Sequence, residues 1–298
     1  MIEISLFGAV AVQVDGVATP HLSAKQRHVL AILALAEGAP VSRERLADQL
    51  WEGAPPVSYV STLDSYVCLL RRSLGLAAGR RSRLATADGG FRLDVGAEIE
   101  VDVASFRALA RVPEEATSRD VVARAEQALQ LLRRGELLAD VPYAEWGRHA
   151  REDLRRSAVD LFLAGAQRAN ALGMSDRAVA LARAATDRDP VCEDAWRQLM
   201  LAHWFSGRRA AALSVYAELR GALLDHLGEE PGSESRQLYL TVLRETSEQA
   251  PQQTDDSGSE LRTLLRLLRQ TLEGIPGVRT PARDAALSEV AVLALASA

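Results

Sequence analysis

A spacing of 34 residues recurs in the second half of the chain and limits the folds that this sequence can adopt. Gly173 and Gly207 are separated by this distance, and so are Ala178 and Ala212. Small residues at such positions let paired helices approach closely, and a large aromatic side chain can fill the adjacent gap. A fixed period of this length is typical of stacked helical hairpins, which bury their apolar faces against one another.

The residues around the repeated positions strengthen this prediction. The first unit continues with Ala182, Ala185 and Pro190, and the second contains Trp196 and Tyr216. Together they match the tetratricopeptide pattern, whose period is 34 residues. An alanine-rich chain can produce single matches by coincidence, but the joint match of Gly, Ala, Trp, Tyr and Pro favours a true repeat.

Strand signals end near Val101, and helical periodicity continues from there. Breaks fall near Gly135, Pro142, Gly173, Pro190, Gly207 and Pro231. We expect an all-α, tetratricopeptide-like domain over 98–248, a polar linker over 249–259 and a C-terminal helical tail over 260–298. An amphipathic helix over 260–273 would carry its leucines on one face, and docking of that face on the chain's own repeats is favoured over docking on a partner. These leucines are Leu261, Leu264, Leu265, Leu268 and Leu272.

Residues 1–97 combine strands and helices in the order typical of a winged helix-turn-helix domain of the α+β class. Alternating apolar residues between positions 2 and 19 predict short strands, with a hairpin turn at Asp15-Gly16. Three helices follow, with starts near Ser23, Ser42 and Ser58 and stops at Gly38, Gly53 and Gly75. A second hairpin has Asp88-Gly89-Gly90 at its tip. The alternative is a small α+β domain with no role in DNA binding.

The third predicted helix has two distinct faces. One face carries Leu63, Val67, Leu70 and Leu74 within about 60° of each other on the helical wheel. The opposite face carries Ser61, Ser65, Cys68 and Arg72. Short side chains let a helix sit deep in the major groove of DNA, and arginine can pair with phosphate or guanine. An ordinary solvated face is the alternative, although such faces usually carry long Glu and Lys side chains.

Basic residues near this helix extend the candidate DNA-binding surface. Lys25 and Arg27 lie in the first turn of the first helix, where cations oppose the helix dipole unless a bound phosphate compensates; simple solvent exposure is the alternative. Three arginines follow the third helix and could track the DNA backbone. The complete predicted set is Lys25, Arg27, Ser61, Thr62, Ser65, Cys68, Arg71, Arg72, Arg80, Arg81, Arg83 and Thr86.

Other classes of function find no support in the sequence. The net charge is −5, so nucleic acid would have to be bound by a local patch in the slightly basic first third. Phosphate-binding, dinucleotide-binding and hydrolase motifs are absent, and the five histidines show no metal-ligand spacing. Cys68 and Cys192 are expected to be free thiols. No leader or long apolar run is present. We expect a cytoplasmic, nucleoid-associated protein that is not an enzyme and needs no cofactor or metal.

Three segments resemble the DNA-binding domain of the SARP family, the Streptomyces antibiotic regulatory proteins of actinobacteria. They are LSAKQRHVLAILALAEGAPVSRERLADQLWEGAPP, STLDSYVCLLRRSLG and LATADGGFRL. LADVPYAEW and the segment from AWRQLMLAHW to SRQLY are similar to the bacterial transcriptional activator domain. The resemblance covers about residues 1–245. It implies an OmpR-type winged helix, like the output domain of two-component regulators, fused to tetratricopeptide-like helices. It also implies binding to direct repeats in double-stranded promoter DNA, with two protomers side by side, and recruitment of RNA polymerase through its sigma factor.

Several residues depart from the family pattern. Val60-Ser61 stands where the family often has Arg-Asn, and Asp64 stands where Gln is frequent. An acid at this place would repel phosphate unless it accepts from cytosine N4 or turns aside. The expected wing sequence Arg-Pro-Pro-Gly-Tyr is replaced by ADGGF at residues 87–91.

The function predicted from these features is sequence-specific activation of transcription, with a secondary-metabolite gene cluster as the target that the resemblance implies. Asp64 and Ala87 motivate a second hypothesis, an interaction scaffold that no longer binds DNA. A third hypothesis is a regulator controlled by a small ligand seated in the helical repeats.

Overall fold

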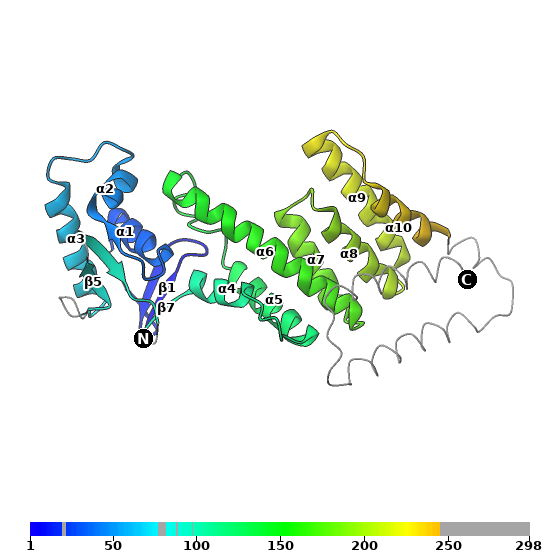
Figure 1. Ribbon diagram of the computed structural model, residues 1–298, viewed down its shortest axis with the longest axis horizontal. Helices are drawn as coiled ribbons and strands as arrows, with labels where there is room; N and C mark the ends of the chain where they lie inside the picture. Colours follow the sequence, from blue (N-terminus) through cyan, green and yellow to red (C-terminus); the bar gives the residue numbers. More distant parts are fainter. Residues whose placement is uncertain (20–21, 77–81, 88, 97, 245–298) are drawn as a thin grey trace.

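The computed structural model describes residues 1–19, 22–76, 82–87, 89–96 and 98–244, and Figure 1 shows them as an elongated arrangement. A part with strands and three helices lies at one end, and a row of antiparallel helices extends from it (Figure 1). The expected fold class, an α+β winged domain followed by an all-α domain, is thus confirmed. The predicted linker at 249–259 and tail at 260–298 lie outside the described residues.

The first sheet has four strands in the order β3-β2-β1-β7. They are β1 (Ile2–Ser5), β2 (Ala11–Val14), β3 (Val17–Ala18) and β7 (Ile99–Val101). The strands β1, β2 and β3 form an antiparallel meander. At the turn between β2 and β3, Asp15 and Gly16 have φ angles of 50° and 77°, as a two-residue hairpin turn requires.

Strand β7 was not anticipated, and it joins the two halves of the chain. It lies just beyond the expected domain limit at residue 97 and pairs in parallel with β1, with Ile2 opposite Ile99. Three residues are too few for an alternating pattern to be recognised, so no clear strand signal marks this segment. Helix α4 (Asp102–Ala110) follows β7 at once.

Three helices pack against a second sheet of strand order β4-β6-β5. The helices are α1 (Ala24–Leu35), α2 (Arg43–Trp51) and α3 (Tyr59–Ser73), and the strands are β4 (Val41–Ser42), β5 (Leu84–Ala87) and β6 (Gly90–Leu93). Ser23 and Gln26 form a capping box at the start of α1, and the Ser42 side chain accepts from the Arg45 amide at the start of α2. These caps confirm two of the expected helix starts.

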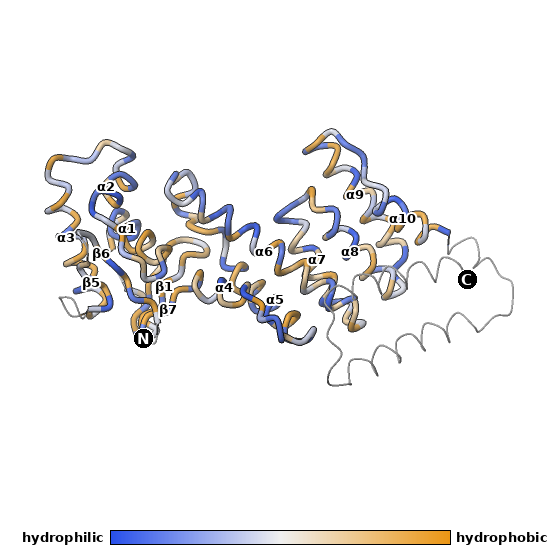
Figure 2. The backbone as a smooth tube through the Cα atoms, in the orientation of Figure 1, coloured by the Kyte–Doolittle hydropathy of each residue, from blue (hydrophilic) through white to orange (hydrophobic). Residues whose placement is uncertain are grey.

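Six further helices complete the second half. They are α5 (Ser118–Leu132), α6 (Glu145–Ala171), α7 (Ser175–Arg188), α8 (Glu193–Phe205), α9 (Arg209–Leu227) and α10 (Ser233–Arg244). All the breaks expected between Gly135 and Pro231 fall in the connections between these helices. Small residues set the helix spacing, since a Cβ atom on Gly165 would lie 2.6 Å from the Ala125 Cβ atom. Figure 2 shows apolar residues alternating with polar ones along these helices, as amphipathic helices require.

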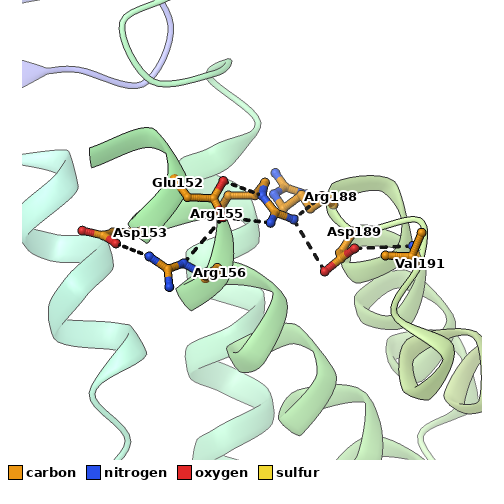
Figure 3. Close-up of polar contacts among 7 residues, drawn as sticks. All are labelled: Glu152, Asp153, Arg155, Arg156, Arg188, Asp189 and Val191. Carbon is orange, nitrogen blue, oxygen red and sulfur yellow. Dashed lines mark hydrogen bonds and ion pairs between the residues drawn. The ribbon is translucent and has the colours of Figure 1, made fainter. Parts of the chain in front are cut away.

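Many carboxylates of the helical half form ion pairs with arginines. Figure 3 shows such a cluster, in which Arg155 and Arg156 of α6 bind Glu152 and Asp153 of the same helix. Arg155 also donates to the Arg188 carbonyl oxygen at 3.0 Å, which ties α6 to the end of α7. The side chains of this cluster are exposed or half-exposed, and they stabilise the contact between α6 and the end of α7.

The junction between the two halves rests on a buried carboxylate. Asp102 is 7% exposed, and it accepts from the backbone N–H groups of Leu6 at 2.9 Å and Phe7 at 3.2 Å. Burial raises the pKa of Asp102, although these two hydrogen bonds oppose the shift. The two residues that follow β1 are thereby fixed to the first turn of α4.

Candidate nucleic-acid interface

Helix α3 exposes the face that the sequence assigned to DNA. Leu63, Val67 and Leu70 are fully buried in the core of the winged domain. Ser61, Ser65, Cys68 and Arg72 are exposed. The hydrophobic effect fixes this orientation, because burying the leucine stripe leaves the short polar side chains outside. We call these four exposed residues the α3 outer face.

The hydroxyl groups at the start of α3 donate to the backbone. Ser61 and Thr62 both donate to the Ser58 carbonyl oxygen, at 3.0 Å and 2.9 Å, and Ser65 donates to the Ser61 carbonyl oxygen at 2.8 Å. Each oxygen keeps lone pairs that point outward from the helix. In these rotamers the hydroxyls are acceptors, suited to the exocyclic amino groups of cytosine and adenine.

Arg72 lies at the end of the α3 outer face. Its guanidinium has no hydrogen bond or ion pair within the part of the chain that the structure describes. Its neighbour Arg71 has a different role, because it donates to the Leu84 carbonyl oxygen at 2.8 Å and to the Thr86 hydroxyl at 3.0 Å. Arg71 and Thr86 therefore fasten α3 to strand β5, and Arg72 is the arginine available to a ligand.

Sequence reasoning missed Arg43, which connects three elements of the winged domain. Its guanidinium donates to Asp64 Oδ1 at 2.7 Å and to the Gly89 carbonyl oxygen at 2.9 Å. It also lies over the Phe91 ring, 4.6 Å from the ring centroid. The pair of Arg43 with Asp64 explains how the chain tolerates Asp64, which departs from the family pattern, because the side chain turns towards Arg43 and its charge is neutralised there. The signal that could have found Arg43 is a cation in the first turn of a helix, the same signal that drew attention to Lys25.

Lys25 and Arg27 lie away from the α3 outer face, and each contacts another part of the protein. Lys25 Nζ donates to the Leu50 carbonyl oxygen, and the ammonium lies 5.6 Å from the centroid of the Trp51 ring. The cation offsets the C-terminal dipole of α2, which stabilises it without a bound phosphate.

Arg27 faces the helical half of the chain. Its Nε atom lies 3.7 Å from Asp140 Oδ2, in the connection between α5 and α6. Beside it, His28 lies 5.9 Å from the Trp146 ring, centroid to centroid. The start of α1 therefore forms part of the contact between the two halves.

The arginines after α3 are only partly described. Arg83 is exposed and pairs with Glu98 at 3.0 Å, and this hydrogen bond lowers the pKa of Glu98. Arg80 and Arg81 lie outside the described residues. Arg83 directly precedes β5, to which Arg71 is bound, so the wing side of α3 carries basic groups whose charges are partly neutralised.

The described residues offer neither a metal site nor a membrane span. No group of three or more His, Cys, Asp or Glu side chains there could hold a metal ion. No helix in that part of the chain is long and apolar enough to cross a membrane. Cys68 and Cys192 are free cysteines, and Cys68 is exposed.

Comparison with known proteins agrees with this architecture. Residues 18–93 match the C-terminal domain of transcriptional regulatory proteins, and residues 101–243 match the bacterial transcriptional activator domain. The regulatory protein DnrI of Streptomyces peucetius is 31% identical over 252 residues, which span 81% of this chain and 92% of DnrI. The transcriptional regulatory protein EmbR of Mycobacterium tuberculosis is also 31% identical, but the chain spans only 64% of EmbR.

A solved structure gives the same result for the fold. The structure of Mycobacterium tuberculosis EmbR in complex with a low-affinity phosphopeptide superposes with a TM-score of 0.67 at 26% identity, covering 92% of this chain and 69% of EmbR. Three findings lead to one conclusion. They are the two domain matches, the winged domain with its exposed α3 face, and the similarity over nearly the whole of DnrI. The chain belongs to the SARP family of transcriptional regulators.

Proposed function

We propose that this protein is a sequence-specific DNA-binding activator of transcription that places α3 in the major groove of promoter DNA. The observation that carries the proposal is the α3 outer face, which is exposed and built of short side chains. It ends in Arg72, whose guanidinium has no partner in the described part of the chain. Its hydroxyls are oriented to accept from base edges, and Arg72 can donate to guanine or phosphate. The pairing of Asp64 with Arg43 removes the electrostatic objection that motivated the scaffold hypothesis.

The proposal narrows the predicted set of DNA-binding residues. Ser61, Thr62, Ser65, Cys68 and Arg72 contact DNA. Arg71 and Thr86 hold α3 against β5, and Arg83 lies at the flank. Lys25 and Arg27 act within the protein instead, since both have intramolecular partners.

The partners follow from the family. Two protomers occupy direct repeats in a promoter, and the helical half engages RNA polymerase, including its sigma factor. DnrI and AfsR, two regulatory proteins of Streptomyces, are among the relatives, which supports a target in a secondary-metabolite gene cluster. Such a role places the protein in the bacterial cytoplasm, on the nucleoid.

Binding-site selection from genomic DNA, followed by fluorescence anisotropy on the selected site, tests the proposal. The Arg72→Ala variant should bind that site about 1–3 kcal/mol more weakly if Arg72 contacts a base. The matched control is Arg119→Ala on α5, which removes an equal charge from another exposed position. Affinity should also fall steeply between about 50 and 200 mM salt. Absence of any complex at low salt, or equal affinities of the two variants, would refute DNA recognition by this face.

A further inference from the structure

The last two helices, α9 and α10, lie at the far end of the helical half (Figure 1) and carry leucines that are 40–56% exposed. Helix α10 packs beside α9 in antiparallel fashion, since Arg209 at the start of α9 donates to the Val242 carbonyl oxygen at 2.7 Å near the end of α10. Between them, the rings of Tyr216 and Tyr239 stack with centroids 4.3 Å apart. This contact fixes which residues of each helix face outward.

Both helices direct leucines to the same side of this contact, away from α8. On α10, Leu240 and Leu243 lie about 60° apart on the helical wheel, and they are 41% and 40% exposed. On α9, Leu213, Ala217 and Leu224 fall within about 40° of each other, beside the side that touches α10. Leu224 is 56% exposed. We call these five residues the α9–α10 end face.

A helical repeat array normally ends in a polar face, because nothing follows to cover its last unit. Here α6 is followed by α7, and α8 is followed by α9, as successive pairs. Helix α10 begins a further pair but has no second helix within the described residues. An array that ends on exposed leucines at that position needs a cover.

We propose that residues 260–273 of the same chain dock on the α9–α10 end face as the missing second helix. Their leucines recur on one face, and their 14 residues would form a helix about 21 Å long. Helix α10, with 12 residues, is about 18 Å long, so the two lengths match. The 15 residues between them reach up to about 50 Å, more than enough to return along α10. The small side chain of Ala217 leaves room for the docked helix to approach α9 closely.

Hydrogen exchange of the full-length chain tests this docking. An isolated helix of this length is marginal in water, so slow exchange at residues 261–272 would report docking. We expect protection of at least about tenfold there. The variant L240E/L243E should abolish it, whereas Thr241→Glu, on another side of α10, should leave it unchanged. Unprotected amides at 261–272 in the wild type, or protection insensitive to L240E/L243E, would overturn the proposal.

A second experiment leaves α9 and α10 untouched. Leu268→Glu changes the middle of the docking segment, and Gln270→Glu places the same charge on its opposite side. In hydroxyl-radical footprinting, Leu268→Glu should increase the oxidation of Leu240 and Leu243 severalfold, and Gln270→Glu should not. Equal oxidation in both variants would contradict docking at this face. Protection that depends on protein concentration would contradict docking within one chain and assign the face to a second copy.

Discussion

Arg43 Nη2 donates to Asp64 Oδ1 at 2.7 Å, and this pair joins the first turn of α2 to the exposed side of α3. Arg43 is mostly buried, because it also binds the Gly89 carbonyl oxygen and lies over Phe91. The pair therefore does two things at once. It neutralises an acid beside the surface that we assign to DNA, and it holds the turn of the wing close to α3.

The first prediction concerns Asp64. The Asp64→Asn variant leaves the Arg43 charge without its partner, so we expect tighter DNA binding and a salt dependence steeper by about one released counterion. Anisotropy titrations over a range of salt concentrations measure both quantities. Asp160→Asn is the matched control, since it removes an exposed acid from α6. Weaker binding confined to sites with a particular cytosine would instead show that Asp64 reads a base.

The second prediction concerns Gly90, at the start of β6. A Cβ atom there would lie 1.9 Å from the Val41 carbonyl oxygen and 2.7 Å from Ser42 Cα. Both are backbone atoms, so they cannot move aside without breaking the pairing of β4 with β6. We expect Gly90→Ala to lower the free energy of unfolding by about 2–3 kcal/mol, measured by urea denaturation.

Gly96→Ala provides the control for this change. A Cβ atom on Gly96 would meet nothing within 4 Å, so its substitution should leave the urea midpoint nearly unchanged. Similar losses in both variants would show that the close approach of β4 to β6 is not the cause.

The third prediction concerns Asp102 at the junction. In the Asp102→Asn variant, the amide oxygen can accept from only one of the two backbone N–H groups that the carboxylate now binds. The substitution should therefore destabilise the protein by about 1–3 kcal/mol. Burial raises the pKa of Asp102 above its ordinary value of 3.8. Between pH 3.8 and the raised pKa, the folded protein therefore binds more protons than the unfolded chain. Its stability falls as the pH rises through this range.

Urea denaturation of the wild type and of Asp102→Asn between pH 3.5 and pH 7 measures the difference in their free energies of unfolding. This is about the range in which carboxylates titrate. The advantage of the wild type over Asp102→Asn should shrink as the pH rises. An advantage that grows with pH would mean that the hydrogen bonds from Leu6 and Phe7 outweigh burial.

The fourth prediction concerns His28, which contacts Trp146 across the junction. Burial lowers the pKa of His28, and the charge of Lys25 lowers it further, while Asp140 opposes the shift. Because the unfolded chain then binds the proton more readily, the protein loses stability as the pH falls below about 6.5. His28→Gln should reduce this loss, measured as the melting temperature between about pH 5 and 8. His226→Gln, at the exposed end of α9, is the control. An unchanged slope in His28→Gln would contradict the assignment.

Local patterns were sufficient to predict much of the fold. Ser23 and Ser42 are the caps that the sequence indicated, and Asp15-Gly16 forms the expected turn. The breaks between helices fall at the expected Gly and Pro residues. The 34-residue spacing correctly indicated stacked helices, since Ala178 and Ala212 are both fully buried. These features depend on neighbours within a few residues or on periodicity, which the sequence displays directly.

The charged residues show where local reasoning ends. Lys25, Arg27 and Arg43 all lie in first helical turns, and the sequence cannot distinguish them. Their partners at Leu50, Asp140 and Asp64 lie 25, 113 and 21 residues away in the chain, and only the packed structure brings them together.

The sequence by itself therefore determined the family, the helices and the amphipathic face that α3 turns outward, because short-range hydrogen bonding and apolar periodicity decide these. The tertiary structure alone decided which basic side chains of the described residues form ion pairs within the protein and which do not. Ion pairs form between residues that meet only after the chain has packed, so Arg43 binds Asp64 while Arg72 has no partner among the residues that the structure describes. It also decided how the two halves are joined, through the pairing of β7 with β1 and the burial of Asp102.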